Sequence, residues 1–374
     1  MQVKTVVRII DSSPIGLSEC MPEIQYPSAN EGILKELREK FKLRDVIADC
    51  YSDAERFCAL REWVRVKMVK HGWSFAKLRE PVRDSLDILK HVENGVLFSC
   101  GFHSMVLRDI ALCLGYPART CGVWSLGYEN PGDREGNIAH AITEIYSGEQ
   151  GKWMMMDADA NVHYELDGAI LSCAELCEQN NINGGARVKA VYGKYLPGFD
   201  VTLDHDTGFV QGVAESGVKW TPSDVRRVES LFLEKDAIGF YQTLTVSEGD
   251  KQYSFTPAGV YPPLSYMGSP VNINKQYHTN NIRFIDHSPY SAYLKICDVR
   301  LLEHGAELDI APITTMNNFS FFRICREDSF EDEKTAVITW HVPLGTSSIT
   351  ITPINEFGVS ADRLHMTVRC TIDG

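Results

Sequence analysis

The apolar positions in the first hundred residues recur at helical spacing. Residues 31–48 have the composition of a helix. Ser52 and Glu55 fit a capping box, in which the serine begins a helix and the glutamate bonds back to it. Apolar residues follow at intervals of three or four, as on one face of a helix: Phe57, Leu60, Val64 and Met68. A shorter helix is predicted over residues 85–92.

A longer helix and three strands are predicted next. Apolar side chains share one face of residues 100–114, and Gly115 is expected to end this helix before Pro117. Three strand-like runs follow: residues 119–124, 139–146 and 152–157. Helices followed by consecutive strands are typical of an α+β domain in which the helices pack on an antiparallel sheet.

The C-terminal third alternates between apolar and polar residues, as β-strands do. The predicted strands are residues 282–285, 292–296, 306–310, 320–324, 336–340 and 348–351. In the last predicted strand every second residue is apolar: Leu364, Met366, Val368 and Cys370. Short strands separated by turns predict an antiparallel β-sandwich. The acidic residues 327–333 are predicted to form a hairpin loop, and the first ten residues of the chain a strand.

The length of the chain indicates two domains. At 374 residues it exceeds what one hydrophobic core usually holds. We expect an α+β domain over residues 1–240, with its core at about residues 50–170 and flanking or connecting segments around it. A C-terminal β-sandwich is expected over residues 250–374.

Charge and composition narrow the possible partners. The formal net charge is −13, so we expect neither nucleic acid nor an anionic membrane surface as a partner. No run of 18 apolar residues occurs, and Lys4 and Arg8 interrupt what would be the apolar core of a signal peptide. The 11 cysteines are scattered among apolar residues, which favours a reducing compartment and the cytoplasm. A secretion signal removed from the sequence remains an open alternative.

Three residues in chain order could perform nucleophilic catalysis. Cys100 lies at the predicted first turn of a helix, where free backbone N–H groups and the helix dipole favour an anion. His140 lies on a predicted strand and could take and return the thiol proton, while Asp157 ends the next strand and could orient the imidazole. Asp159 is a rival for this third role. Most buried cysteines on amphipathic helices are core residues, so the thiol alone would be weak support.

Residues 85–167 resemble the transglutaminase-like (papain-type cysteine) superfamily core. Four motifs in order carry the resemblance: Cys100, the Gly-Tyr-Pro-Ala-Arg run at 115–119, the His-Ala-Ile-Thr-Glu run at 140–144, and Trp153 followed by Asp157. It implies a papain-like catalytic domain with Cys100 as nucleophile, His140 as base and acid, and Asp157 as the orienting carboxylate. The spacing from Trp153 favours Asp157 over Asp159. One departure is Ile142, where the family usually has an aromatic residue.

Roles are also expected for residues around these three, for Arg119 from the resemblance and for the others from their spacing. The resemblance implies that Arg119 braces the fold. His103, three residues after Cys100, is expected to be structural or to line the cleft. Cys173 and Cys177 are four residues apart, but the sequence has no second ligand pair at zinc spacing, so they are expected to be core residues. No metal and no cofactor is predicted.

The function expected from this resemblance is amide or peptide bond hydrolysis through a thioester. Transfer of the acyl group to an amine, which crosslinks proteins, would use the same mechanism. A glycan-linked amidase, similar to peptide:N-glycanases, is the runner-up, because four tyrosines outside the motifs hint at a ligand surface: Tyr261, Tyr266, Tyr277 and Tyr290. A binding or scaffold protein with an idle triad is the non-enzyme alternative. The expected substrate is a peptide, protein or glycan-linked amide.

Overall fold

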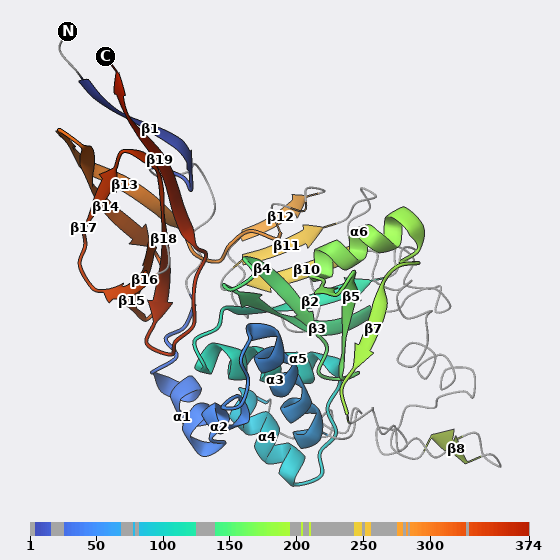
Figure 1. Ribbon diagram of the computed structural model, residues 1–374. Helices are drawn as coiled ribbons and strands as arrows, with labels where there is room; N and C mark the ends of the chain where they lie inside the picture. The colour runs from blue at the N-terminus through green and yellow to red at the C-terminus, as the bar shows by residue number, and fades with distance from the viewer. Residues whose placement is uncertain are drawn as a thin grey trace. The chain divides into compact units, whose positions relative to one another are not determined.

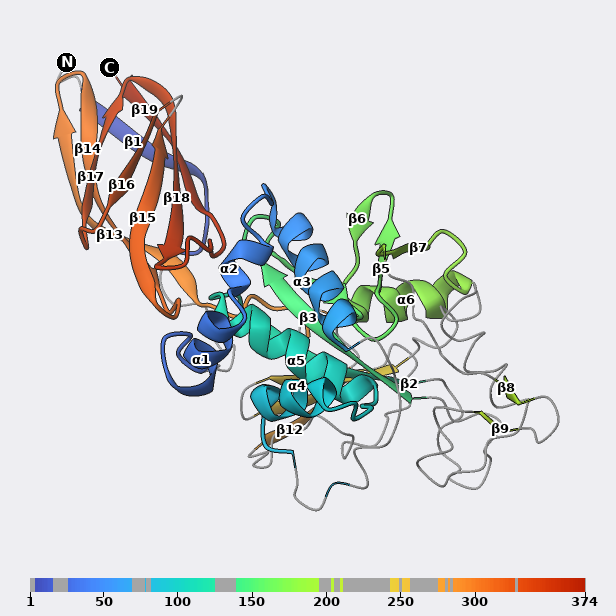
Figure 2. The ribbon, with the colours of Figure 1, turned by 90° about the horizontal axis from the view of Figure 1, so that it is seen from below.

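The protein is an α+β protein made of two compact units (Figures 1 and 2). The computed structural model describes residues 4–15, 26–68, 78, 82–124, 139–194, 203–204, 209–210, 243–248, 251–255, 275–279, 282, 285–326 and 329–373. The first unit, here called the β unit, comprises Met1–Ile24, Ser147–Gly151 and Ser288–Gly374. The second, the α+β unit, comprises Gln25–Tyr146 and Lys152–His287. None of the helices in the described ranges has the length and apolarity needed to cross a membrane.

The α+β unit contains all the helices of the described residues. These are α1 (Gly32–Lys40), α2 (Leu43–Val46), α3 (Asp53–Lys67), α4 (Ser85–Glu93), α5 (Cys100–Cys113) and α6 (Cys173–Asn183). Its strands are β2 (Ala118–Trp124), β3 (Ala139–Ser147), β4 (Lys152–Met156), β5 (Val162–Leu166), β6 (Ala169–Ile170), β7 (Lys189–Tyr192), β8 (Leu203–Asp204), β9 (Phe209–Val210), β10 (Thr243–Glu248), β11 (Lys251–Phe255) and β12 (Lys275–Thr279).

A six-stranded sheet forms the centre of this unit, in the order β12-β11-β10-β2-β3-β4. Helices α3, α4 and α5 lie on one side of it and α6 on the other (Figure 1). Strands β2 and β3 are antiparallel, as are β10 and β2, whereas β11 and β12 are parallel. A smaller sheet, β6-β5-β7, is antiparallel and follows directly along the chain from β4.

The predicted helix signals are confirmed. Ser52 Oγ accepts a hydrogen bond from the Glu55 N–H at 3.2 Å, and the Glu55 carboxylate accepts one from the Ser52 N–H at 3.0 Å. Helix α5 ends at residue 113, and Gly115 follows with φ +86°, a conformation that glycine adopts without the steric cost of a Cβ. The alternation of apolar residues along 364–370 is also confirmed, because Leu364, Met366, Val368 and Cys370 are all buried.

The β unit consists of antiparallel sheets. Its strands are β1 (Lys4–Ser12), β13 (Ala292–Leu302), β14 (Gly305–Thr314), β15 (Phe319–Arg326), β16 (Ser329–Glu333), β17 (Ile338–Pro343), β18 (Gly345–Asn355) and β19 (Leu364–Asp373). They form one sheet in the order β1-β19-β18-β15-β16 and another in the order β13-β14-β17. A single apolar core contains residues of both, such as Ile310 and Trp340 from the smaller sheet and Ile351 and Val368 from the larger.

The boundaries of the two units differ from the expected residues 1–240 and 250–374. Strand β1 pairs with β19, with Lys4 opposite Asp373, so the first strand belongs to the β unit. Strand β10 pairs with β2, and β11 with β10, so residues 243–255 belong to the central sheet of the α+β unit. An alternation of apolar and polar residues identifies a strand but does not say which sheet the strand joins. The order of the strands along the chain did not predict their sheets here.

Two local predictions were wrong. The acidic segment at 327–333 contains a strand, β16, rather than only a loop. Its acidic side chains pair with arginines of β15: Arg323 bonds Asp332 at 2.8 Å, and Arg326 bonds Glu331. Of the predicted strand at 282–285, the two described residues lie in a turn, where the Ile285 N–H donates to the Ile282 carbonyl at 2.9 Å. The alternation of apolar and polar residues reveals neither the arginine partners of the acidic residues nor the backbone hydrogen bond of the turn.

Candidate active site

Cys100 is the first residue of α5, and the packing of this helix on β3 brings it to His140. Ser104, one turn further along the helix, donates from its hydroxyl to the Ile142 carbonyl at 2.6 Å. In return, the Thr143 hydroxyl donates to the Ser104 carbonyl at 2.9 Å. These two bonds fix the helix start against the strand that carries His140.

His140 and Asp157 form a short, buried hydrogen bond. The Nε2 atom of His140 lies 2.7 Å from Oδ2 of Asp157. Oδ1 of the same carboxylate accepts the N–H groups of Asp159 at 3.0 Å and Ala160 at 2.9 Å. Both oxygens of the Asp157 carboxylate therefore accept hydrogen bonds, which fix its orientation. Because Nε2 of His140 bonds Asp157, Nδ1 is the ring nitrogen that is available to Cys100.

The turn after Asp157 is held by two arginines of α3. Arg65 donates to the Asp159 carbonyl at 2.8 Å, and Arg61 donates to the Asn161 side-chain oxygen at 3.0 Å. Asn161 has φ +51°, in the left-handed region that asparagine tolerates better than most residues. Both arginines are buried, and burial lowers the pKa of each guanidinium. Helix α3 thus holds the turn that follows Asp157.

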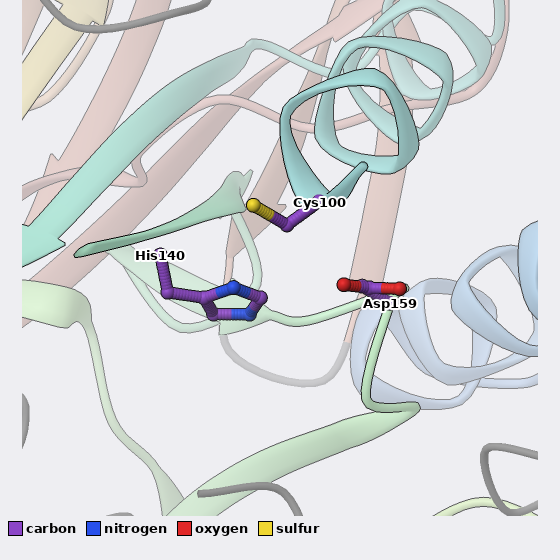
Figure 3. A group of neighbouring side chains, drawn as sticks. All are labelled: Cys100, His140 and Asp159. Carbon is purple, nitrogen blue, oxygen red and sulfur yellow. The ribbon is translucent and has the colours of Figure 1, made fainter. Parts of the chain in front are cut away.

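Asp159, the rival for the third role, lies beside Cys100 and His140 (Figure 3). The Cys100 sulfur, a ring nitrogen of His140 and a carboxylate oxygen of Asp159 all lie within 4.8 Å of one another. Cys100 is 7% exposed and His140 6%, whereas Asp157 and Asp159 are 1% and 2% exposed. All four residues are buried, the two carboxylates more completely than Cys100 and His140.

The charges around His140 favour its protonated form. Burial by itself lowers the pKa of the imidazole, since it disfavours the charged ring. The negative charges of Asp157 and Cys100, and the hydrogen bonds to both, outweigh burial and hold the pKa of His140 well above its ordinary value. A protonated His140 between Cys100 and Asp157 is suited to stabilise a thiolate and later to protonate a leaving group.

His103 was expected either to be structural or to line the cleft, and its contacts are those of a structural residue. It is fully buried, with Nδ1 3.1 Å from the Ser99 carbonyl and Nε2 3.0 Å from the Met68 carbonyl. Carbonyl oxygens only accept, so the ring satisfies both of them when both nitrogens carry protons. Its Nε2 also lies 3.6 Å from Oδ1 of Asp159. His103 thus connects the start of α5 to the end of α3.

Arg119 braces the sheet, as predicted. It is fully buried, donates from Nε to Glu144 at 2.7 Å and from Nη1 to the Ile285 carbonyl at 2.8 Å. Its guanidinium carbon lies 3.8 Å from the centre of the Trp153 ring. The residues Arg119, Glu144 and Trp153, which come from three of the motifs, therefore pack together.

The other buried cysteines have surroundings that keep the thiol protonated. Burial raises the pKa of Cys121 to about 11 and that of Cys173 and Cys177 well above the ordinary value. Cys173 and Cys177 are core residues, as expected. Cys297 and Cys325 are exposed, although the sequence has its cysteines scattered among apolar residues.

A second cysteine–histidine pair was missed by sequence reasoning. The Cys58 sulfur lies 3.7 Å from Nδ1 of His163, and Nε2 of that ring lies 3.1 Å from Glu165. Arg61 occupies Nδ1 at 2.6 Å, and burial, followed by this guanidinium, lowers the pKa of His163. Burial also raises the pKa of Cys58, so this thiol is held in its protonated, unreactive form. The spacing of His163 and Glu165 on one strand face was the available signal.

Comparison with known proteins adds nothing to the motifs. No protein-family model matches the chain, and no curated protein matches it. The likeness to the transglutaminase-like core stays a prediction.

The ligand surface predicted from four tyrosines is only partly within the described residues. Tyr290 is buried, with 6% of its surface exposed. Only the backbone of Tyr277 is described, and Tyr261 and Tyr266 lie outside the described residues.

Proposed function

We propose that the protein is a cysteine-dependent amide or peptide bond hydrolase of the transglutaminase-like, papain-type kind. In this proposal the α+β unit is the catalytic domain and the β unit a β-sandwich. One observation carries it: His140 bonds Asp157 through Nε2 at 2.7 Å, and its other side faces a cysteine at a helix start. This is the nucleophile, base and orienting group of a catalytic triad.

The reaction begins with attack on the substrate carbonyl. The Cys100 thiolate forms a bond to the carbonyl carbon, and the electron pair of the double bond moves to oxygen. The first backbone N–H groups of α5 have no partner within the helix, so the N–H of Cys100 can donate to this oxyanion. When the oxyanion collapses, the carbon–nitrogen bond breaks, and the proton of His140 goes to the leaving amine.

The second half of the reaction releases the acyl group. The neutral His140 takes a proton from a water molecule, which attacks the thioester carbon. The carbon–sulfur bond then breaks and restores the Cys100 thiolate beside a protonated His140. Asp157 keeps the ring in one orientation through both halves, because its bond to Nε2 leaves Nδ1 on the side of the sulfur. An amine in place of water would give acyl transfer.

The test compares the reactivity of the thiols within one chain. The reduced protein is treated at pH 6 with an iodoacetamide-based peptide amide, and each labelled cysteine is identified by peptide mass spectrometry. We expect Cys100 to react faster than the exposed Cys297, because a thiolate reacts and ordinary thiols are largely protonated at this pH. The Cys100→Ala variant should lose this label, and Cys58→Ala should keep it.

Turnover is then measured with peptide and glycopeptide amides, with Cys100→Ala as the blank. Hydrolysis gives a free acid, and in the presence of an added primary amine any transfer gives a new amide. A Cys100 that reacts no faster than Cys297, in a protein that binds a peptide or glycan tightly, would refute the proposal in favour of a binding protein.

A further inference from the structure

Asp159 performs no step in the reaction above, yet its carboxylate lies beside the nucleophile (Figure 3). A sulfur, an imidazole nitrogen and a carboxylate oxygen lie within 4.8 Å of one another at Cys100, His140 and Asp159. We propose that these three residues bind a zinc ion, which blocks the thiol reversibly. That the ion inhibits catalysis rests on the proposed function, whereas the zinc site itself does not.

The donor set and its spacing suit zinc. Zinc is bound in proteins by thiolate, imidazole and carboxylate at about 2.0–2.3 Å, with a tetrahedral arrangement. Ligand atoms at the corners of such a tetrahedron lie about 3.5 Å apart. Side chains whose donor atoms already lie within 4.8 Å of one another need only small rotations to reach that spacing. A zinc ion with three protein ligands takes a water molecule as its fourth ligand.

The groups behind the ligands orient them for a metal. Asp157 bonds Nε2 of His140 at 2.7 Å, so Nδ1 faces the sulfur; a carboxylate on the far nitrogen is the usual support of a zinc-bound histidine. The backbone of Asp159 is fixed through its carbonyl by Arg65 at 2.8 Å. Two of the three ligands are therefore already held in place.

The chemistry favours zinc over magnesium or calcium and makes the binding reversible. Magnesium and calcium prefer oxygen ligands throughout, whereas thiolate and imidazole suit zinc. When the ion binds, His140 gives its ring proton to solvent and Cys100 binds as the thiolate. Arg65 lies 3.9 Å from Oδ1 of Asp159 and opposes a nearby cation. We therefore expect an exchangeable ion rather than a permanent structural zinc.

A second group among the described residues provides the contrast. Donor atoms of Cys121, Glu144 and Cys173 also lie within 4.8 Å of one another. Both oxygens of Glu144 already accept hydrogen bonds, one from Arg119 at 2.7 Å and one from the Cys173 N–H at 2.6 Å. All three residues are at most 1% exposed. A cation there would have to displace a buried guanidinium, so this group should not bind zinc.

The test is a zinc titration of the reduced, chelator-treated full chain against a chromophoric competitor. We expect one ion per chain and no competition by magnesium or calcium. Asp159→Asn should weaken binding about 100-fold or more, since loss of a mere outer partner already costs about 10- to 100-fold. Cys100→Ser should behave likewise, and the matched variant Cys173→Ser should bind as the wild type does. Thermal melting of each variant checks that it is folded.

Alkylation of Cys100 with and without zinc separates this inference from the proposed function. Zinc should protect Cys100 in the wild type and fail to protect it in Asp159→Asn at the same concentration. Wild-type affinity in Asp159→Asn, or stoichiometry unchanged in Cys100→Ser, would overturn the zinc site. Zinc bound at Cys100 in a protein without turnover would overturn the hydrolase alone. Rapid alkylation that zinc does not slow would overturn the zinc site alone.

Discussion

Replacing Arg119 by methionine should destabilise the α+β unit strongly. Methionine fills much of the same space but has neither charge nor donor. The variant loses the 2.7 Å bond to Glu144, the 2.8 Å bond to the Ile285 carbonyl and the stacking over Trp153. It also leaves the Glu144 carboxylate buried without its cation, and removing one partner of a buried ion pair costs about 3–5 kcal/mol. A typical domain has only about 5–15 kcal/mol of stability, so the change is a large fraction.

The chain offers a matched control for this experiment. Arg83 bonds Asp87 at the same distance of 2.7 Å, but its side chain is 78% exposed. Solvent screens such a pair, so Arg83→Met should change the free energy of unfolding by less than about 0.5 kcal/mol. The double variant Arg119→Met/Glu144→Gln should regain much of the lost stability, because the charge of the fully buried Glu144 is removed together with its cation.

Urea unfolding followed by circular dichroism at 222 nm measures the effect. All helices of the described residues lie in the α+β unit, so the helical signal reports on that unit. If Arg119→Met lies within 1 kcal/mol of Arg83→Met, the buried pair does not brace the fold, and the reasoning is refuted. A double variant no more stable than Arg119→Met would refute the role assigned to the unpaired Glu144 charge.

Three further predictions concern charge in the α+β unit. Asp157→Asn should lower the turnover of a hydrolysed amide about 10⁴-fold, as in serine triads, because the amide permits the wrong imidazole tautomer; a loss below tenfold in single-turnover kinetics would contradict the assigned role. The pKa of His140 is raised above its unfolded value, so its contribution to stability is complete below about pH 6.5 and is lost as pH rises through the folded pKa. NMR titration should show this pKa, which the charges of Asp157 and Cys100 raise, falling in Asp157→Asn, and an unchanged value would count against it. The pKa of Asp286 is raised to about 7 by burial and by Glu144, so the native state keeps a proton that the unfolded chain gives up near pH 4. Stability should therefore fall between about pH 4 and 7, and urea denaturation of Asp286→Asn should show a flatter dependence; the same slope in both proteins would contradict this.

Local signals in the sequence predicted elements well and their assembly poorly. The capping box of Ser52 and Glu55 and the glycine after α5 act through neighbouring backbone groups, so a short window contains all the necessary information. The partner of β1 lies more than 350 residues away, and nothing in residues 4–12 identifies it. Strand β16 pairs with β15, where Arg323 lies opposite Asp332 and Arg326 bonds Glu331. The acidic composition of the segment did not reveal these partners.

The candidate site shows the same division. The order of Cys100, His140 and Asp157 along a helix and two strands, together with the resemblance of four motifs to a known family, led us to expect these residues together. The carboxylate of Asp159 joins the cluster because the Asp157 side chain caps the turn that follows it, accepting hydrogen bonds from the N–H groups of Asp159 and Ala160. Cys58 and His163 are 105 positions apart on α3 and β5, so only the packing of a helix on a strand reveals them.

The pairing of β1 with β19 has a consequence for how the protein is made. During synthesis the first strand leaves the ribosome long before its partner, because Lys4 lies opposite Asp373. At about 5–20 residues per second, the ribosome needs roughly 20 to 70 s to supply that partner. The residues of the α+β unit lie between them, so they emerge while β1, with its exposed Ile9 and Ile10, still lacks its neighbour. A nascent chain stalled before residue 364 should therefore hold an intact α+β unit together with a sheet whose edge is open to chaperones or to other chains.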